Sequence, residues 1–179
     1  MRKIENSELG RLQIDEFKEH PKNPLVLILD DIRSLNNVGS AFRTADAFIL
    51  EKIYLCGITG TPPHREINKT ALGATESVQW EHHQNIVTLI KELTQEGFQI
   101  VVIEQTDVSV SLTEFQPDPG QRYALIFGNE VFGVKDELLP LAHHCIDIPQ
   151  YGTKHSLNIS VCLGITVWTF LDRMQLLKP

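Results

Sequence analysis

Two patterns of apolar residues alternate along this chain: short continuous runs and stretches with helical spacing. The first run, PLVLILD at residues 24–30, starts with a proline and predicts a strand that is buried on both faces. The first helical stretch is expected to open at Asn37, because asparagine is a favourable N-cap residue. Its apolar positions are Val38, Ala41, Phe42, Ala45 and Phe48.

The same alternation continues to the end of the chain, interrupted by a loop rich in Ser, Pro, Asp and Gly at residues 107–121. Alternating apolar strands and helices predict an α/β fold, with an open, mostly parallel sheet and helices on both faces. In such sheets ligands bind beyond the carboxyl ends of the strands. Further strands are predicted at residues 51–58, 77–82, 98–105, 122–128 and 144–149, and further helices at 67–72, 85–97 and 135–142.

The segment from Ser156 onward is apolar around most of its circumference, unlike an ordinary surface helix. A helix of this kind needs more than one partner. We therefore expect it to be buried partly within the fold and partly in a homodimer interface. One apolar stripe comprises Leu157, Val161, Ile165, Trp168 and Leu171, and Ile159, Cys162 and Val167 lie on other faces.

Length and composition predict one main domain. A chain of 179 residues and 20.3 kDa is large enough for a hydrophobic core. Residues 1–23 are polar and weakly helical, so we interpret them as an N-terminal arm or short helix and residues 24–179 as the domain. No apolar run approaches the roughly 20 residues of a membrane span, and the N-terminus lacks an apolar signal core. A cytoplasmic location and no membrane partner are expected.

Charge and cysteine content narrow the function classes. The formal net charge of −7 argues against a protein that coats nucleic acid by bulk electrostatics, but it is compatible with a local basic patch. The adjacent pairs His82–His83 and His143–His144 lack a carboxylate or cysteine at metal-ligand spacing, so no metal site is expected. An odd number of widely spaced cysteines favours buried free thiols; these are Cys56, Cys145 and Cys162.

Standard nucleotide-binding and nucleophile motifs are missing from the sequence. There is no G-x-G-x-x-G after the first strand, no G-x-x-x-x-G-K-[ST] and no G-x-S-x-G. This leaves Arg43, which lies about two turns into a helix of otherwise apolar character. A structural salt bridge is the alternative to a functional role for this guanidinium.

Three separated blocks carry glycine together with amide, carboxylate or guanidinium groups. Together they resemble the motifs of the SpoU/TrmH family of RNA ribose 2'-O-methyltransferases, in the SPOUT superfamily. Residues 36–48 match its N-x-G-x-x-x-R pattern through Asn37, Gly39 and Arg43. Residues 125–134 match its F-G-[NA]-E-x-x-G pattern through Gly128, Asn129, Glu130 and Gly133. Residues 146–165 match its I-P-x-x-G-x-x-x-S-L-N-x-S pattern through Ile148, Pro149, Gly152, Ser156, Leu157, Asn158 and Ser160.

The resemblance, which covers about residues 24–173, implies a SPOUT fold, with a Rossmann-like sheet and a C-terminal segment that forms a trefoil knot. It also implies a cofactor, S-adenosylmethionine, held in that knot by Gly128, Ile148 and Leu157. Glycine lets the main chain approach a ligand, and isoleucine and leucine pack against an adenine. Backbone binding of the adenosine accounts for the missing nucleotide motifs.

The same resemblance assigns the catalytic role to Arg43, either as general base or as a clamp for the phosphate beside the target ribose. The clamp agrees better with a guanidinium pKa above about 12. Asn37 is expected to hold this arginine or the phosphate, and Glu130 to order its loop. Ser156 and Asn158 are expected to frame the methyl and ribose pocket. Structural roles as caps and loop staples are the alternative for these four residues.

The implied substrate is tRNA or rRNA, methylated on a ribose 2'-hydroxyl. A cationic rim around the site would localise RNA binding despite the acidic net charge. Its candidates are Arg33, His64, Arg65, Lys69 and Lys154, which as scattered solvated charges would have no such role. Three alternatives stay open: a knotted methyltransferase acting on an RNA base, a non-catalytic RNA-binding factor with this fold, and a small-molecule enzyme.

Overall fold

In a computed structural model, described at residues 1–5 and 8–177, the chain forms one twisted α/β sheet with helices on both sides. Two terminal residues of the predicted domain, Lys178 and Pro179, lie outside the described part. The described strands are β1 (Asn23–Asp30), β2 (Leu50–Cys56), β3 (Trp80–His83), β4 (Phe98–Ile103), β5 (Val110–Ser111), β6 (Arg122–Phe127) and β7 (His144–Asp147). The helices are α1 (Ile14–Glu19), α2 (Leu35–Ala47), α3 (Arg65–Ala71), α4 (Ala74–Ser77), α5 (Ile86–Gln95), the 3-10 helix η2 (Asp136–Leu141) and α6 (Ile159–Arg173).

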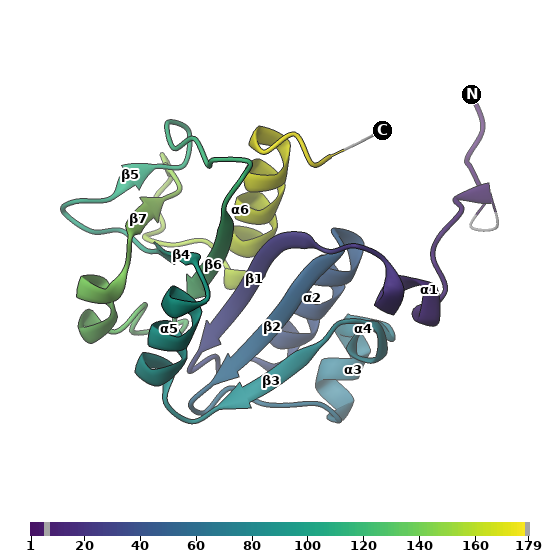
Figure 1. Cartoon of the computed structure of the whole chain (residues 1–179), viewed down its shortest axis with the longest axis horizontal. Coiled ribbons are helices and arrows are strands. Elements are labelled where there is room, and N and C mark those ends of the chain that lie inside the picture. The colour runs from purple at the N-terminus through teal and green to yellow at the C-terminus, as the bar shows by residue number, and fades with distance from the viewer. Residues whose placement is uncertain (6–7, 178–179) are drawn as a thin grey trace.

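The sheet has seven strands in the order β3-β2-β1-β6-β4-β7-β5 (Figure 1). Each neighbouring pair is parallel, which confirms and sharpens the prediction of a mostly parallel sheet. All strands therefore point their carboxyl ends to the same edge. The second and third sequence blocks follow β6 and β7 at that edge, and the first block follows β1.

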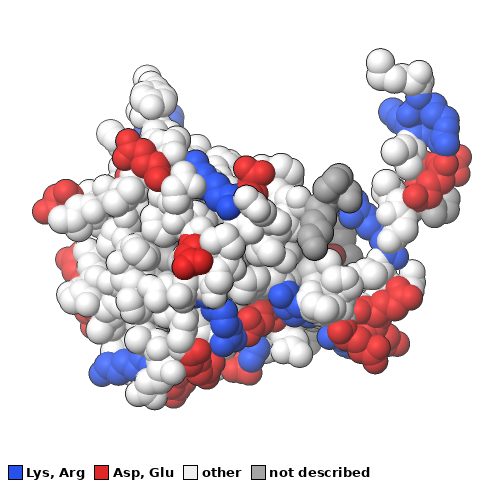
Figure 2. Space-filling view, turned by 45° about the horizontal axis from the view of Figure 1, so that its top comes forward, with Lys and Arg blue, Asp and Glu red and all other residues white. Residues whose placement is uncertain are grey.

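The segment before the sheet leaves the body of the protein (Figure 1). Its short helix α1 docks through Phe17, which is buried, whereas Ile4, Leu9 and Leu12 are exposed. Figure 2 shows that this segment carries basic and acidic side chains together, and that both signs also lie side by side on the body. Charges of both signs are therefore mixed on this face, and its described residues form no single large basic surface.

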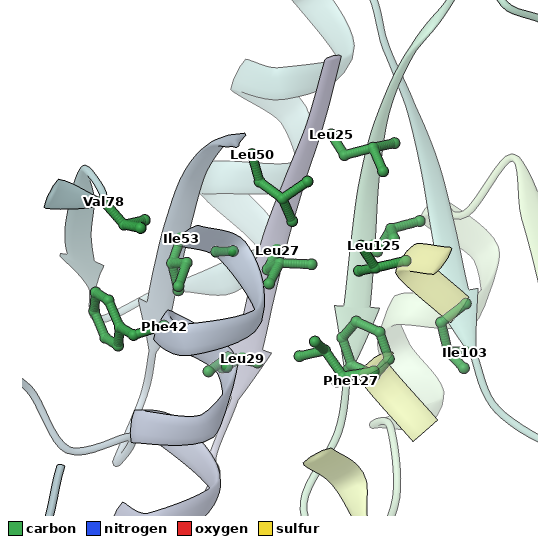
Figure 3. Close-up of a cluster of buried hydrophobic side chains, with 14 of the residues drawn as sticks. Leu25, Leu27, Leu29, Phe42, Leu50, Ile53, Val78, Ile103, Leu125 and Phe127 are labelled. Carbon is green, nitrogen blue, oxygen red and sulfur yellow. The ribbon is translucent and has the colours of Figure 1, made fainter. Parts of the chain in front are cut away.

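The core has two layers, because successive residues of each buried strand point to opposite faces. Leu25, Leu27 and Leu29 of β1 pack under α2, α3, α4 and α6 (Figure 3). Val26 and Ile28 pack under α5 and η2 on the other face. Both faces are covered, as predicted, and the continuous apolar runs in the strands follow from this double burial.

Helix α2 starts earlier than predicted. Its first residue is Leu35, and its N-cap is Ser34, whose hydroxyl accepts the Asn37 backbone N–H at 3.3 Å. Asn37 thus lies inside the first turn, and its side chain is available for contacts elsewhere. The prediction of Asn37 as N-cap was wrong because serine caps helices as well as asparagine does, and the sequence carries both types within four positions.

Smaller differences concern short elements. The predicted strand 77–82 is shifted to β3, because residues 74–77 form the short helix α4. Residues 135–142, predicted as a helix, contain a 3-10 helix with Pro140 inside it. The loop 107–121 contains the two-residue edge strand β5. Among the described helices, none has the length and apolar character needed to cross a bilayer.

Candidate active site

Three loops at the carboxyl ends of β4, β6 and β7 surround a hollow with a volume of about 670 Å³. We call it the large hollow. Gly128, Ile148 and Leu157, the residues expected to bind the cofactor, all line it, and so do Glu130, Ser156 and Asn158. The second and third sequence blocks therefore converge at one place. The strand order brings them together, because β6 and β7 are separated only by β4.

Glu130 joins the second block to the first. Its Oε2 accepts the backbone N–H of Arg33 at 3.0 Å, and its Oε1 accepts that of Ser34 at 3.0 Å. The side-chain amide of Asn37 also donates to Oε1 at 3.0 Å. The amide of Asn158 donates in turn to Asn37 Oδ1 at 3.3 Å. One side chain from each block thus joins a single chain of hydrogen bonds, which we call the Asn158–Asn37–Glu130 chain.

These contacts fix the charge of Glu130. Partial burial raises the pKa of its carboxyl group, but the hydrogen bonds from Arg33, Asn37 and Ser34 outweigh burial, and the pKa is lowered overall. At neutral pH the group is an ionised acceptor. It cannot supply a proton there, so its chemistry is that of an anchor for the start of α2.

The loop at residues 128–134 is closed by its own backbone. Asn129 and Gly133 exchange N–H to carbonyl bonds at 3.0 and 2.9 Å, and Gly133 has the left-handed φ of 69° that glycine tolerates. A Cβ on Gly128 would come within 2.3 Å of the Gly133 carbonyl carbon. The missing side chain of Gly128 thus admits Gly133. Gly128 also lines the large hollow, and its expected contact with a cofactor stays a prediction.

A second set of contacts holds this loop to the end of β1. The amide of Asn129 donates to the backbone carbonyl of Asp31 at 2.7 Å. Lys135 lies 2.7 Å from the Asp31 carboxylate and 3.2 Å from that of buried Asp30. Asp31 itself has a left-handed φ of 53°, uncommon outside glycine and costly unless neighbours hold it. The loop after β1 and the loop after β6 are therefore built as one unit.

Glu104 is a member of the site that the sequence did not reveal. It follows β4 and lines the large hollow, where its Oε2 accepts the Val134 backbone N–H at 3.0 Å. Its neighbour Gln105 donates to the His155 carbonyl at 3.3 Å. Together they bridge the loops after β6 and β7. The sequence pattern predicts both residues inside a strand at 98–105, whereas β4 ends at Ile103. The signal that could have identified Glu104 is a carboxylate at the carboxyl end of a strand.

Arg43 lines a second, smaller hollow of about 450 Å³, which we call the cationic hollow. It lies between α2, α3 and the start of α6, and Lys69 and Ser160 also line it. The Arg43 side chain is exposed, and within the described part of the chain its guanidinium makes neither a hydrogen bond nor an ion pair. The alternative reading as a structural salt bridge therefore has no partner among the described residues.

The two hollows adjoin at the start of α6. Asn158 lines the large hollow and caps this helix, and its Oδ1 accepts the Ser160 hydroxyl at 2.6 Å. Ser160 lines the cationic hollow. Gly39 matters for the second hollow, because a Cβ there would lie 2.1 Å from Thr70 Oγ1 and 2.2 Å from the Ile67 carbonyl oxygen. Only glycine lets α2 and α3 approach this closely.

The remaining rim candidates are exposed but scattered. Arg33 lies at the start of the loop before α2 and contacts Glu130 through its backbone. His64 caps α3, with its Nδ1 accepting the Glu66 N–H at 3.2 Å, and Arg65 is the first residue of that helix. Lys154 lies on the loop after β7. Of the predicted RNA-binding residues, the structure brings Lys69 to the hollow that Arg43 lines and keeps the others apart from it.

The fold and the site together define a class of protein: an open parallel α/β protein with a ligand site beyond the carboxyl ends of its strands. The sequence allows a narrower statement. Residues 24–168 match the SpoU rRNA Methylase family, and the chain belongs to that family.

Individual relatives agree with this membership. The chain is 29% identical over 164 residues to "23S rRNA (guanosine-2'-O-)-methyltransferase RlmB" of Neisseria meningitidis serogroup B, covering 92% of this chain and 64% of the relative. It is 31% identical over 157 residues to "tRNA (guanosine(18)-2'-O)-methyltransferase" of Aquifex aeolicus, covering 87% and 72%. The chain thus spans slightly less than two thirds of the first of these relatives.

A solved structure supports the fold. The AdoMet-bound rRNA methyltransferase from Sinorhizobium meliloti superposes with a TM-score of 0.79 at 27% identity, covering 92% of this chain and 60% of that one. This agreement extends over the sheet and both helical layers, since the covered part includes nearly all described residues.

Proposed function

We propose that this protein transfers a methyl group from S-adenosylmethionine to a ribose 2'-hydroxyl of tRNA or rRNA. The single observation that carries the proposal is the Asn158–Asn37–Glu130 chain, which joins all three family motifs between the two hollows. The named relatives act on ribose in both kinds of RNA, which supports the reaction class without choosing the substrate.

The large hollow fits the cofactor. Its volume of about 670 Å³ falls within the range typical of small-molecule sites, roughly 300–1,000 Å³. Ile148 and Leu157 offer apolar surface for an adenine, and polar loop backbone surrounds them. The hollow also bears carboxylates and, among the described residues that line it, neither lysine nor arginine, which suits a cationic ligand. When bound, S-adenosylmethionine supplies an electrophilic methyl group on its sulfonium sulfur.

Arg43 acts in this proposal on the RNA and not on the cofactor. A guanidinium is always protonated and only donates hydrogen bonds. Arg43 therefore binds the phosphate beside the target ribose and orients the ribose hydroxyl by donating a hydrogen bond to its oxygen. The ribose oxygen would form a bond to the methyl carbon as the bond between that carbon and the sulfonium sulfur breaks, which would leave S-adenosylhomocysteine, and the hydroxyl proton would leave to water. Asn37 and Asn158 border the ribose position, Ser156 borders the methyl position, and Glu130 orders the loops. Positioning of this kind supplies much of a rate enhancement.

The experiment is to incubate the protein with labelled S-adenosylmethionine and unmodified tRNA and rRNA transcripts, and then to digest the product to nucleosides. We expect label in 2'-O-methylated nucleosides. Label in a methylated base would establish the alternative of base methylation. Cofactor binding by calorimetry without transfer to any RNA would favour a small-molecule enzyme, and absence of both would favour a non-catalytic RNA-binding factor.

A homodimer belongs to the same proposal. Val161, Ile165 and Trp168 on α6 remain 48%, 39% and 54% exposed, and this apolar stripe lies beside the cationic hollow, whose lining Phe48 stacks edge-on against Trp168. A second copy would cover the stripe. Sedimentation should give a dimer for the protein and a monomer for Trp168→Asp. A monomeric parent protein would contradict this part.

Four further assignments complete the proposal. The segment between β7 and α6 forms a trefoil knot, which predicts a shortened unfolded length when the chain ends are pulled apart.

Residues 1–23 form an arm, and residues 24–179 form the methyltransferase domain, so a chain that starts at residue 22 should still bind the cofactor. Arg33, His64, Arg65 and Lys154 extend the RNA-binding rim. The protein works in the cytoplasm.

A further inference from the structure

Phe132 is an aromatic side chain in an unusual position. It lines the large hollow, yet 84% of its surface is exposed. The adjacent Val131 is 66% exposed. A phenylalanine normally buries its ring, because the ring contributes a large apolar area. An exposed one at the mouth of a ligand site is therefore a candidate contact for a ligand.

The loop holds Phe132 outward by specific contacts. Asn129 Oδ1 accepts the backbone N–H groups of Val131 at 2.9 Å and Phe132 at 3.1 Å. The Asn129–Gly133 backbone pair closes the loop immediately after the ring. Side-chain and backbone bonds thus fix both ends of a five-residue tip. The ring is presented on a braced turn, so stacking on it would require little further ordering.

The charges of the two hollows decide what can reach this ring. The large hollow is bordered by Glu104, Asp136 and Asp147 and, within the described residues, by no lysine or arginine. The cationic hollow carries Arg43 and Lys69. A phosphate is repelled by the first and attracted by the second. A nucleotide bound across the start of α6 would therefore direct its phosphate to the cationic hollow and its uncharged base to the other side.

We propose that Phe132 stacks on the base of the nucleotide whose ribose is methylated. The proposal rests on the proposed function and adds a substrate class to it: the target nucleotide is unpaired or turned out of its helix, because a base within a duplex has no free face. The ribose lies over Asn158, between a phosphate held by Arg43 and a base held by Phe132. Stacking is tolerant of base identity, so Phe132 sets position more than sequence.

The test compares Phe132→Ala with Phe132→Trp and Tyr151→Ala. Tyr151 is the matched control, because it is an aromatic residue that is 96% exposed and lies outside the lining of both hollows. The readouts are kcat/KM for transfer to unmodified RNA transcripts, cofactor affinity by calorimetry, and sedimentation. We expect Phe132→Ala to lower kcat/KM about 5- to 150-fold, which corresponds to the loss of one base–aromatic stack. Phe132→Trp should recover most of the activity that Phe132→Ala loses, because an indole ring also stacks on a base, and Tyr151→Ala should stay near the parent protein.

An RNA that lacks the base at the methylated position gives the decisive comparison. The parent protein should lose activity on it by a similar factor, and Phe132→Ala should show little further loss, since ring and base act as one pair. Equal kcat/KM for parent and Phe132→Ala would overturn the inference while leaving the proposed function intact. So would loss of cofactor binding or of the dimer in Phe132→Ala, which would make the ring a cofactor or subunit contact. Absence of RNA methylation by the parent would overturn both.

Discussion

The two hollows that meet at the start of α6 are built in different ways. The large hollow is made of loops after three parallel strands, and their backbones and carboxylates bond to one another. The cationic hollow is made of side chains that project from three helices. The first depends on the fold, so a change in one loop should disturb its neighbours. The second depends on individual side chains, so one substitution should remove a function while the structure persists.

The sharpest test of this difference is Arg43→Ala. We expect methyl transfer to fall on the order of 100-fold, because a misplaced substrate alone can cost that much. Cofactor affinity should not change, since Arg43 does not line the large hollow. Transfer kinetics and calorimetry measure the two effects. Arg43→Lys should recover little, because an ammonium lacks the planar fork. Reduced cofactor affinity in Arg43→Ala would show that the hollows are not separable.

Asn158 stands between the hollows, and two substitutions divide its contacts. Asn158→Ala should reduce transfer about tenfold, as expected for one catalytic hydrogen bond, and lower the free energy of unfolding by about 0.5–2 kcal/mol through loss of the α6 cap. Asn158→Asp keeps an oxygen for the Ser160 N–H but cannot donate to Asn37. It should retain stability and lose transfer. Chemical unfolding and kinetics check this, and an active Asn158→Asp would contradict the role of the Asn37 contact.

Gly39→Ala perturbs the helices behind the cationic hollow. Because a Cβ would lie 2.1 Å from Thr70 Oγ1 and 2.2 Å from the backbone oxygen of Ile67, α2 and α3 must separate. Overpacking of this kind lowers the free energy of unfolding by about 1–3 kcal/mol. The control is Ser40→Ala, because the Ser40 hydroxyl donates, within the described part of the chain, only to the Asn36 carbonyl of its own helix. A Gly39→Ala protein as stable as Ser40→Ala would contradict the close approach of the two helices.

Glu130→Gln tests the anchor by pH. The lowered pKa of Glu130 means that its contacts stabilise the folded protein fully above the ordinary glutamate pKa and lose this effect as pH falls through the folded value. Glutamine keeps an uncharged acceptor, and the site is partly exposed, so the loss at pH 7 should be about 1 kcal/mol or less. The difference between parent and variant should narrow below about pH 4 in denaturant titrations. A difference independent of pH would contradict the charged anchor.

The sequence predicted the strands and helices well where burial dictates the pattern. Continuous apolar runs such as residues 24–30 occur because β1 is covered on both faces. Short elements escaped prediction, because β5 contains two residues and its pairing with β7 depends on tertiary contact. The helix start at Leu35 escaped for a related reason: Ser34 and Asn37 are equally suitable caps, and the side chain of Asn37 instead donates to Glu130, which is far away in the sequence.

The motifs named several residues that line the large hollow, among them Glu130, Ile148 and Asn158. They did not predict how the motif residues contact one another, because 93 residues separate Asn37 from Glu130 and 121 separate it from Asn158. Glu104 was missed for a local reason. A carboxylate directly after an apolar strand looks like the strand's polar end, and only the neighbouring loop of residues 128–134 gives it a partner. Phe132 lies within the second block of the sequence, but its apolar side chain alone would predict burial. Its exposure follows from the hydrogen bonds that hold the turn at residues 129–133.

The position of β1 in the middle of the sheet has a consequence for how the protein is made. One of its edges pairs with β2, but the other waits for β6, which begins at Arg122. A nascent chain must therefore emerge well past its midpoint before this central strand loses its open edge. Until then the amino-terminal half exposes an apolar template on which other chains can assemble. Parallel pairing between strands this far apart in the sequence is intrinsically slow, so the strand order favours slow folding.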